Sequence, residues 1–165
     1  MDPITIEEIV YITGGKLITG DSHLEVDSVS TDSRTAEKDS LFIPLRGENF
    51  DGHDFIDSAI MDRGVAAILT EKALEALNRS EVAVIEVPDT LKALQAIASY
   101  NRRRYDIPII AITGSSGKTT TKDMIYTVLS KKFSVLATEG NLNNEIGLPL
   151  TLLRLDSSHE VAVLE

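Results

Sequence analysis

The chain has 165 residues, of which 42% are hydrophobic and 25% are charged, and its formal net charge is −10. This length suits one domain or two small ones, and the composition is typical of a soluble globular protein. The negative charge disfavours nonspecific binding to nucleic acid. Because the chain has no cysteine, disulfides and thiolate metal sites are excluded.

The N-terminal residues are acidic and lack the basic start and apolar core of a secretory signal peptide. No apolar run approaches the length that a membrane span requires. We therefore expect a cytoplasmic protein with no membrane partner.

Hydrophobic periodicity and turn residues predict alternating strands and helices in the first 106 residues. A capping box formed by Thr5 and Glu8 predicts a first helix, which ends at Gly14. The other expected helices cover residues 54–63, 71–78 and 91–104, and the helix over 54–63 is expected to bury Phe55, Ala59 and Ile60. Strands are expected near residues 16–18, 26–30, 41–45, 65–69 and 82–87.

A domain boundary is predicted at residues 106–108, which divides the chain into domains 1–106 and 107–165. After the boundary, strands are expected over residues 109–112, 133–137 and 161–164, with a helix over 149–155. Open parallel sheets usually have more than three strands. We therefore expect an incomplete sheet whose last strand is an unpaired edge, and an N-terminal fragment of a longer protein.

The most informative motif follows the first of these strands. Residues 113–120 read TGSSGKTT, a glycine-rich turn that leads into a helical segment. Backbone N–H groups and the positive end of a helix suit anionic oxygens. We predict that Lys118 reaches the β- and γ-phosphates of a nucleotide and that the Thr119 hydroxyl binds Mg²⁺. Ile112 stands where the full pattern has a glycine, so the alternative is an ordinary strand-to-helix turn.

Two polar segments of the first half can bind a ligand. Residues 30–34 (STDSR) can hydrogen-bond a sugar, a uracil edge or a diphosphate, or can form an Asx/ST turn closed by Arg34. Residues 47–55 (GENFDGHDF) form a loop between a strand and a helix, where binding residues are common. We interpret His53 as a turn residue or a substrate hydrogen-bonding group, because no second histidine lies at metal-ligand spacing.

Two further features lie in the second half. Residues 139–150 contain two glycines and three asparagines. Such a segment can approach a ligand closely, or it can be a long turn that caps the next helix. Glu165 follows the strand over 161–164 and is expected in the same sheet as the phosphate loop. Its carboxylate either completes the Mg²⁺ shell or faces solvent.

Taken together, these motifs resemble those of the Mur ligases, the ATP-dependent amide-forming enzymes of peptidoglycan synthesis. Residues 30–34, 41–48 and 51–55 are similar to the family's UDP-substrate-binding first domain, and residues 113–120 to its phosphate loop. Residues 140–153 are similar to the family members that add D-alanyl-D-alanine. They lack the Thr-Thr-Pro stretch expected of the members that add the third residue of the stem peptide.

The resemblance implies an α/β fold, in which a small UDP-substrate-binding domain precedes the start of a phosphate-loop ATPase domain with a mostly parallel sheet. It implies ATP and Mg²⁺ as cofactors and UDP-MurNAc-tripeptide and D-alanyl-D-alanine as substrates, with a role in cell-wall biogenesis. The tripeptide carboxylate attacks the γ-phosphate of ATP, and the amine of D-alanyl-D-alanine attacks the resulting acyl phosphate. The family's later domains lie beyond this chain, which we therefore expect to be inactive alone.

The resemblance also assigns roles to residues of this sequence. It implies that Lys118 is catalytic and that Thr119 and Glu165 are the metal ligands. The ATP-binding residues are Gly114, Ser115, Ser116, Gly117, Lys118, Thr119 and Thr120. The substrate-binding residues are Asp32, Ser33, Arg34, Asn49, Asp51, Gly52, His53, Asn143 and Asn144, with the two asparagines near the diphosphate.

Other functions fit parts of the pattern. A Mur ligase that adds the third residue and a noncatalytic UDP-sugar- or nucleotide-binding module are the main alternatives. A folylpolyglutamate synthase is disfavoured because it lacks the domain that carries the Asp-Ser-Arg and Asp-Gly-His-Asp-Phe motifs. A regulatory GTPase is disfavoured because the chain has no Asn-Lys-x-Asp sequence. The sequence makes no prediction of oligomeric state.

Overall fold

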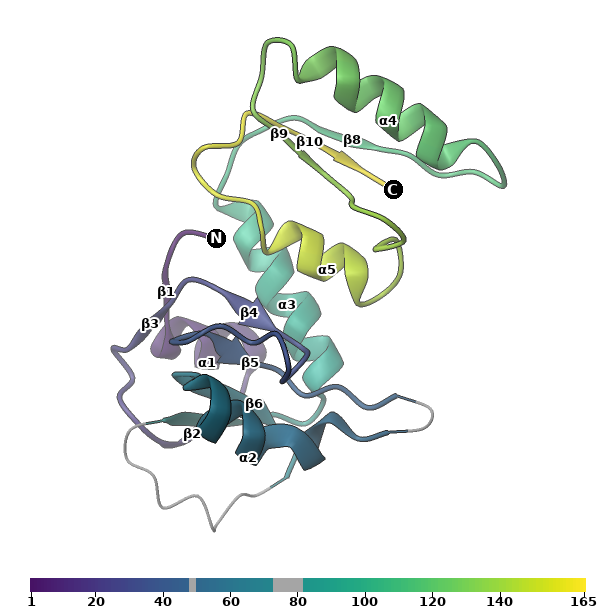
Figure 1. The fold of residues 1–165 in the computed structure, drawn as a ribbon. Coiled ribbons are helices and arrows are strands. Elements are labelled where there is room, and N and C mark those ends of the chain that lie inside the picture. Colours follow the sequence, from purple (N-terminus) through teal and green to yellow (C-terminus); the bar gives the residue numbers. More distant parts are fainter. Residues whose placement is uncertain (48–49, 73–81) are drawn as a thin grey trace. The chain divides into compact units, whose positions relative to one another are not determined.

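A computed structural model describes residues 1–47, 50–72 and 82–165 (Figure 1). The fold is mixed α/β with mostly parallel sheets, as predicted. It divides into two compact units, Pro3–Ile97 and Ala98–Glu165 with Met1–Asp2. Helix α3 (Thr90–Arg103) therefore contributes residues to both units. The domain boundary at residues 106–108 stays a prediction.

The unit Pro3–Ile97 is built on a five-stranded sheet of order β2-β7-β6-β5-β4, in which only β2 is antiparallel to its neighbour. The strands are β2 (Lys16–Thr19), β4 (Val29–Ser30), β5 (Leu41–Phe42), β6 (Ala67–Thr70) and β7 (Ala83–Glu86). Every residue of β6 is buried, as expected for an interior strand of a parallel sheet. A second, two-stranded sheet pairs β1 (Ile4–Thr5) with β3 (Glu25–Val26).

The first helix, α1 (Ile6–Thr13), begins and ends where the sequence predicts. The Thr5 hydroxyl accepts a hydrogen bond from the backbone N–H of Glu8 at 3.2 Å, and the Glu8 carboxylate accepts one from the backbone N–H of Thr5 at 2.9 Å. Gly14 ends the helix with a φ of 64°, a conformation that favours glycine. The predicted capping box is confirmed.

Two predictions in this unit are wrong in part. Residues 26–30 do not form one strand, because β3 and β4 belong to different sheets. In place of the helix predicted over 54–63, the chain forms a 3₁₀ turn (Gly52–Phe55), the short helix α2 (Ile56–Ser58) and a π-helical turn (Ala59–Arg63). Phe55 is 48% exposed although we expected it to be buried, because a 3₁₀ turn changes the periodicity of the inward face. Most of the helix predicted over 71–78 lies outside the described residues.

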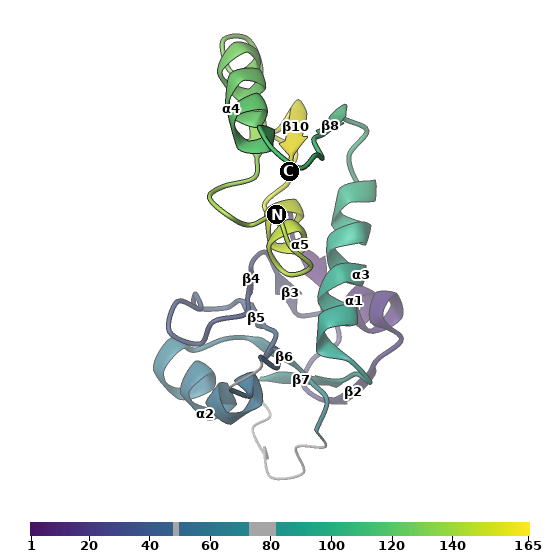
Figure 2. The ribbon, with the colours of Figure 1, turned by 90° about the vertical axis from the view of Figure 1, so that its right-hand side faces the viewer.

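The second unit has a parallel sheet of three strands, β8 (Ile109–Ala111), β9 (Val135–Ala137) and β10 (Val161–Leu164), in the order β8-β10-β9. Helix α4 (Lys118–Leu129) connects β8 to β9, and α5 (Gly147–Leu152) lies between β9 and β10 in the chain. Figures 1 and 2 show α4 and α5 on opposite sides of this sheet. The phosphate-loop motif thus joins a strand to a helix, as predicted.

The last strand is not an edge, contrary to our expectation. β10 pairs with β8 on one side and with β9 on the other. All four residues of β10 are buried, which is the burial expected of a central strand in a parallel sheet. In the described unit the edges are β8 and β9 instead.

Asn101 of α3 hydrogen-bonds to backbone carbonyl groups at and just after the C-terminal end of α5. Its amide nitrogen donates hydrogen bonds to the carbonyl oxygens of Leu152 and Leu155, both at 2.9 Å. The side chain is almost fully buried, and its Oδ1 atom has no hydrogen-bond partner among the described residues. Asn101 therefore supplies a donor to the Leu155 carbonyl and a second donor to the Leu152 carbonyl, which also accepts from the backbone N–H of Leu155 at 3.1 Å.

Asn101→Ala is expected to lower the free energy of opening of the second unit by about 2 kcal/mol, because the Leu155 carbonyl loses its donor and the Leu152 carbonyl loses one of its two donors. Hydrogen exchange at the Ala162 amide, which donates to the Pro108 carbonyl, measures this change. Ser99→Ala is the matched control, since Ser99 is an exposed residue of the same helix. Equal effects of the two substitutions would contradict the capping role.

Within residues 1–47, 50–72 and 82–165, every helix is too short or too polar to cross a membrane.

Candidate functional site

The phosphate loop leaves the carboxyl end of β8 and enters α4 at Lys118. The Ile112 backbone N–H donates to the Leu164 carbonyl at 2.8 Å, which fixes the start of the loop to β10. Gly117 is the N-terminal cap of α4 and has a φ of 74°, which favours glycine. The first backbone N–H groups of a helix have no partner within the helix, so this end of α4 can bind an anion.

Lys118 lies over the loop that precedes it. Its ammonium group donates a hydrogen bond to the Gly114 carbonyl at 2.9 Å, and the loop itself is exposed to solvent. No acidic residue lies in the first turn of α4. The loop therefore presents a cation and free N–H donors with no carboxylate in that turn to neutralise them, which is the arrangement that suits phosphate oxygens.

Glu165 connects three segments of this unit. Its carboxylate accepts hydrogen bonds from the Thr119 hydroxyl at 3.0 Å and from the Asn143 amide at 2.9 Å. The amide of Asn143 is the main cause that holds the pKa of the Glu165 carboxyl below its usual value, and Thr119 and the charge of Lys118 add to it. The structure brings together Thr119, Asn143 and Glu165, which are distant in sequence.

The same oxygens fit a magnesium ion. The Thr119 hydroxyl and the Glu165 carboxylate are hard oxygen donors within 3.0 Å of each other at the phosphate loop. Among the described residues, no group of three or more His, Cys, Asp or Glu side chains surrounds a metal-sized site. Mg²⁺ usually takes one or two carboxylates and completes its shell with phosphate oxygens and water, so this donor set suits it.

Asn144 has a different role from its neighbour Asn143. Its side-chain oxygen accepts hydrogen bonds from the backbone N–H groups of Ile146 at 3.1 Å and Gly147 at 2.7 Å. These N–H groups are at the start of α5, so Asn144 caps that helix. This is the geometry of the alternative interpretation, in which the asparagine-rich segment is a turn before a helix. Only Asn143 of the pair contacts Glu165.

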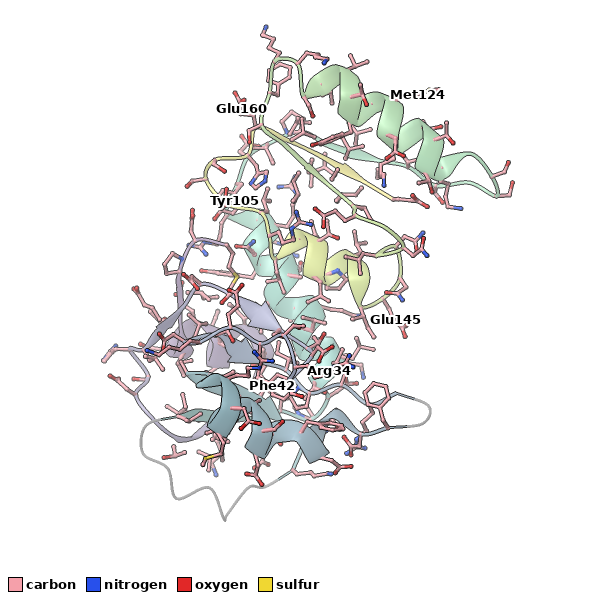
Figure 3. All side chains as sticks on the ribbon, in the orientation of Figure 1. Arg34, Phe42, Tyr105, Met124, Glu145 and Glu160 are labelled. Atoms are coloured by element: carbon pink, nitrogen blue, oxygen red, sulfur yellow. The ribbon has the colours of Figure 1, made fainter. Side chains whose placement is uncertain are left out.

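The residues 30–34 form a turn in the unit Pro3–Ile97. The Asp32 carboxylate accepts from the backbone N–H of Arg34 at 2.9 Å, and from its guanidinium at 2.9 and 2.6 Å. This is an Asx turn closed by Arg34, the second of our two interpretations. The Arg34 side chain is 85% exposed, and Figure 3 shows it among the labelled residues. The turn thus holds an arginine that stays accessible to a ligand.

Arg34→Ala is expected to raise the pKa of Asp32 toward its ordinary value of 3.8. Hydrogen bonds from the side chain and backbone of Arg34 hold that pKa at about 2. A depressed pKa stabilises the folded state above pH 3.8, and this contribution is lost as the pH falls toward 2. Because the pair is exposed, the effect on stability is small. Titration of the Asp32 carboxyl by ¹³C NMR measures the shift, and an unchanged pKa in the variant would refute this cause.

His53 is fully buried and hydrogen-bonded through both ring nitrogens. Nε2 accepts from the backbone N–H of Glu71 at 3.2 Å, so the ring proton is on Nδ1, which donates to Asp51 at 2.6 Å. A hydrogen bond from the backbone N–H of His53 is the main reason that the pKa of Asp51 is far below its usual value.

The neighbouring Gly52 fits closely against Leu45, which precedes it in the chain. A Cβ on Gly52 would lie 2.6 Å from the Leu45 carbonyl oxygen, so this turn requires glycine. Asn49 lies outside the described residues.

The polar residues around this turn are not evident from the sequence. Lys72 donates to the Asp51 carboxylate at 3.1 Å, and Arg46 pairs with Glu71 at 3.1 Å. Glu71 also accepts from the backbone N–H of Thr90 at 2.9 Å, at the start of α3. These contacts join residues that are 19 to 25 positions apart in the chain, a separation that hydrophobic periodicity does not reveal.

Family models match most of the chain. The model described as Mur ligase family, catalytic domain, matches residues 25–102, and the Mur ligase middle domain matches residues 112–165. The UDP-N-acetylmuramoyl-tripeptide–D-alanyl-D-alanine ligase of Bacillus subtilis is 44% identical over 98% of this chain and 35% of its own length. The chain thus spans about a third of the curated relatives that it matches.

Solved structures agree with these matches. A crystal structure of MurF from Acinetobacter baumannii superposes with a TM-score of 0.87 at 37% identity, over all of this chain and 36% of that one. The MurF ligase of Thermotoga maritima, solved in complex with ADP, gives a TM-score of 0.73 at 36% identity over 83% of this chain and 31% of that one. The α/β fold predicted from the sequence is confirmed.

Proposed function

Because the chain belongs to the Mur ligase family, we propose that it is the N-terminal part of an ATP-dependent ligase that joins D-alanyl-D-alanine to UDP-MurNAc-tripeptide. The observation that carries this proposal is the 44% identity to a ligase of that name over 98% of the chain. In this proposal residues 1–106 bind the UDP substrate, and residues 107–165 begin the ATP-binding domain. The remaining two thirds of the enzyme would complete the active site.

The phosphate loop would bind the ATP that activates the tripeptide carboxylate. That carboxylate attacks the γ-phosphate, ADP leaves, and the amine of D-alanyl-D-alanine then displaces phosphate from the acyl phosphate. Lys118 and the N-terminal end of α4 would neutralise charge on the transferred phosphoryl group. Gly114, Ser115, Ser116, Gly117 and Thr120 would supply the rest of the loop that surrounds the phosphates.

Thr119 and Glu165 would hold the magnesium ion of the nucleotide. When bound, Mg²⁺ would neutralise negative charge on the phosphate groups. Asn143 keeps one oxygen of the Glu165 carboxylate occupied, so the other oxygen is directed to the Thr119 hydroxyl. This orientation is a reason to assign both residues to the metal.

The UDP part of the substrate would bind to the first unit. Arg34 is the best-placed cation for its diphosphate, because Asp32 fixes one edge of the guanidinium while the side chain stays exposed. Asp51 and His53 would act through the shape of their turn, since the ring nitrogens of His53 are both engaged. Ser33, Gly52 and Asn49 complete the proposed set. We place the reaction in the cytoplasm, where ATP is available.

Isothermal titration calorimetry of the chain tests this proposal. We expect saturable binding of UDP-MurNAc-tripeptide and, separately, of Mg–ADP, with weaker binding of UDP-MurNAc-dipeptide. Binding of the UDP substrate without Mg–ADP would favour a noncatalytic UDP-sugar-binding module. Preference for the dipeptide substrate would favour a ligase that adds the third residue, and binding of neither ligand would contradict the proposal.

A further inference from the structure

Lys122 is a buried cation that the proposed reaction does not use. It lies in the second turn of α4, and its side chain is 6% exposed. Lysine is rarely buried, because its ammonium group is strongly hydrated in water. The position is unfavourable for two further reasons: the N-terminal end of a helix repels cations, and Lys118 lies four residues earlier on the same face. Packing alone does not account for a lysine here.

The contacts of Lys122 lead toward the phosphate loop. Its ammonium group donates a buried hydrogen bond to the carbonyl of Thr138 at 2.8 Å and lies 3.4 Å from the carboxylate of Asp123, which is 65% exposed. Thr138 directly follows β9 and is 2% exposed. Lys122 therefore ties the carboxyl end of β9 to α4 through a charge-assisted hydrogen bond.

Thr138 carries this connection to Glu165. Its hydroxyl accepts a hydrogen bond from the backbone N–H of Glu165 at 3.1 Å, and its own N–H donates to the Val163 carbonyl at 3.2 Å. The Glu165 carboxylate in turn faces the Thr119 hydroxyl. Two hydrogen bonds thus link Lys122 through Thr138 to the backbone of Glu165, whose carboxylate lies beside the phosphate loop.

We propose that Lys122 is a positioning residue, whose ammonium group holds the Thr138 backbone so that the Thr138 hydroxyl fixes Glu165 opposite Thr119. The proposal rests on the function proposed above, because it assigns Lys122 to the organisation of the nucleotide and magnesium site. Lys122 acts through Thr138 and does not itself touch the phosphates.

Hydrogen exchange and nucleotide binding test this role in the full chain. Lys122→Met keeps the length of the side chain and removes the donor, and Lys131→Met is the matched control in the exposed turn that follows α4. We expect Lys122→Met to lose protection at the amides of Thr138 and Glu165, while the amides of Ala162 and Leu155 keep theirs. We expect its affinity for Mg–ADP to fall about tenfold, the effect of one lost charge-assisted contact. Lys122→Arg keeps the donor and the charge, so this variant is expected to retain much of the amide protection and much of the affinity for Mg–ADP.

Two results would overturn the proposal. Unchanged exchange at Thr138 and Glu165 would show that Lys122 does not hold them, and an equal loss of protection at all four amides would show that it only supports the fold. If Lys122→Met does not fold, Thr138→Val replaces it, because this variant removes the hydroxyl and leaves the carbonyl that Lys122 binds. Thr138→Val should lower the protection of the Glu165 amide from hydrogen exchange and weaken Mg–ADP binding. Unchanged protection of this amide would again refute the proposal.

Failure of the proposed function is distinguishable from failure of this inference. If the unmodified chain binds no Mg–ADP, the proposed nucleotide site is wrong, whatever Lys122 does. The exchange measurement needs no ligand, so it still decides whether Lys122 positions Glu165. In a double variant, Lys122→Met with Thr138→Val, the Glu165 amide should lose no more hydrogen-exchange protection than in either single variant, because both substitutions break the same link from Lys122 to Glu165.

Discussion

Lys118→Ala is expected to weaken the binding of Mg–ADP by about 100-fold, because an ammonium group at the phosphates makes charge-assisted hydrogen bonds that together contribute about 3 kcal/mol. The free energy of unfolding should change by less than about 0.5 kcal/mol, since the hydrogen bond of this ammonium group among the described residues is to a carbonyl of an exposed loop. Calorimetric titration with Mg–ADP and urea unfolding measure the two quantities.

The matched control is Lys131→Ala, which removes an exposed lysine from the turn that follows the same helix. Its affinity for Mg–ADP should stay within about twofold of the unmodified chain, because a solvated surface charge contributes little at a distance. A similar loss in both variants would show that general positive charge, and not the position of Lys118, determines nucleotide binding. Full affinity in Lys118→Ala would contradict the assignment of the phosphate loop.

Gly147→Ala is expected to destabilise the second unit by about 3 kcal/mol, because the new methyl group overlaps backbone atoms that cannot move aside freely. A Cβ at this position would lie 2.4 Å from the Cα and 2.6 Å from the carbonyl carbon of Leu142. Gly147 is also buried at the start of α5, where its N–H donates to Asn144 at 2.7 Å. The substitution should displace the adjoining segment and with it the contact from Asn143 to Glu165.

Gly140→Ala controls for the loss of a glycine in the same segment. Gly140 has a φ of 52°, and a Cβ there would meet no atom within 4 Å. Its replacement should cost about 1 kcal/mol from backbone strain alone. Hydrogen exchange at the amides of the second unit measures both variants. If Gly147→Ala cost no more than Gly140→Ala, the close approach of Leu142 would not constrain the site.

Local patterns predicted the parts of the fold that depend on neighbouring residues. The capping box of Thr5 and Glu8, the strand–loop–helix around Lys118 and the buried strand Val161–Leu164 all follow from spacing within a few residues. The position of Glu165 is predictable because Glu165 follows a strand of the same parallel sheet, and the carboxyl ends of parallel strands lie on the same side of the sheet. The structure places Glu165 on that side, beside Thr119.

The errors concern contacts that the sequence does not encode locally. The order β8-β10-β9 depends on which strands pair, so the last strand was wrongly expected at an edge. Phe55 is exposed because a 3₁₀ turn replaces the regular helix that its periodicity suggested. Asn143 and Asn144 look equivalent in sequence, yet in the structure one contacts Glu165 and the other caps α5, and their substrate-binding roles stay predictions.

Lys122 illustrates what a sequence motif hides. It follows the GKTT motif by two residues, and nothing in the sequence distinguishes it from a surface lysine. Its burial and its bond to Thr138 depend on the packing of α4 against β9, which are separate segments of the chain. The contacts by which Lys122 and Thr138 hold Glu165 beside the phosphate loop are therefore visible only in the folded structure.

A chimera tests the central claim most directly. It joins this chain to the remaining two thirds of the Bacillus subtilis ligase, in place of the segment that the chain matches over 162 residues. We expect the chimera to consume ATP and to form a product from UDP-MurNAc-tripeptide and D-alanyl-D-alanine, and the same chimera with Lys118→Ala to form none. A folded chimera that binds ADP but forms no product from these two substrates would contradict the proposed function.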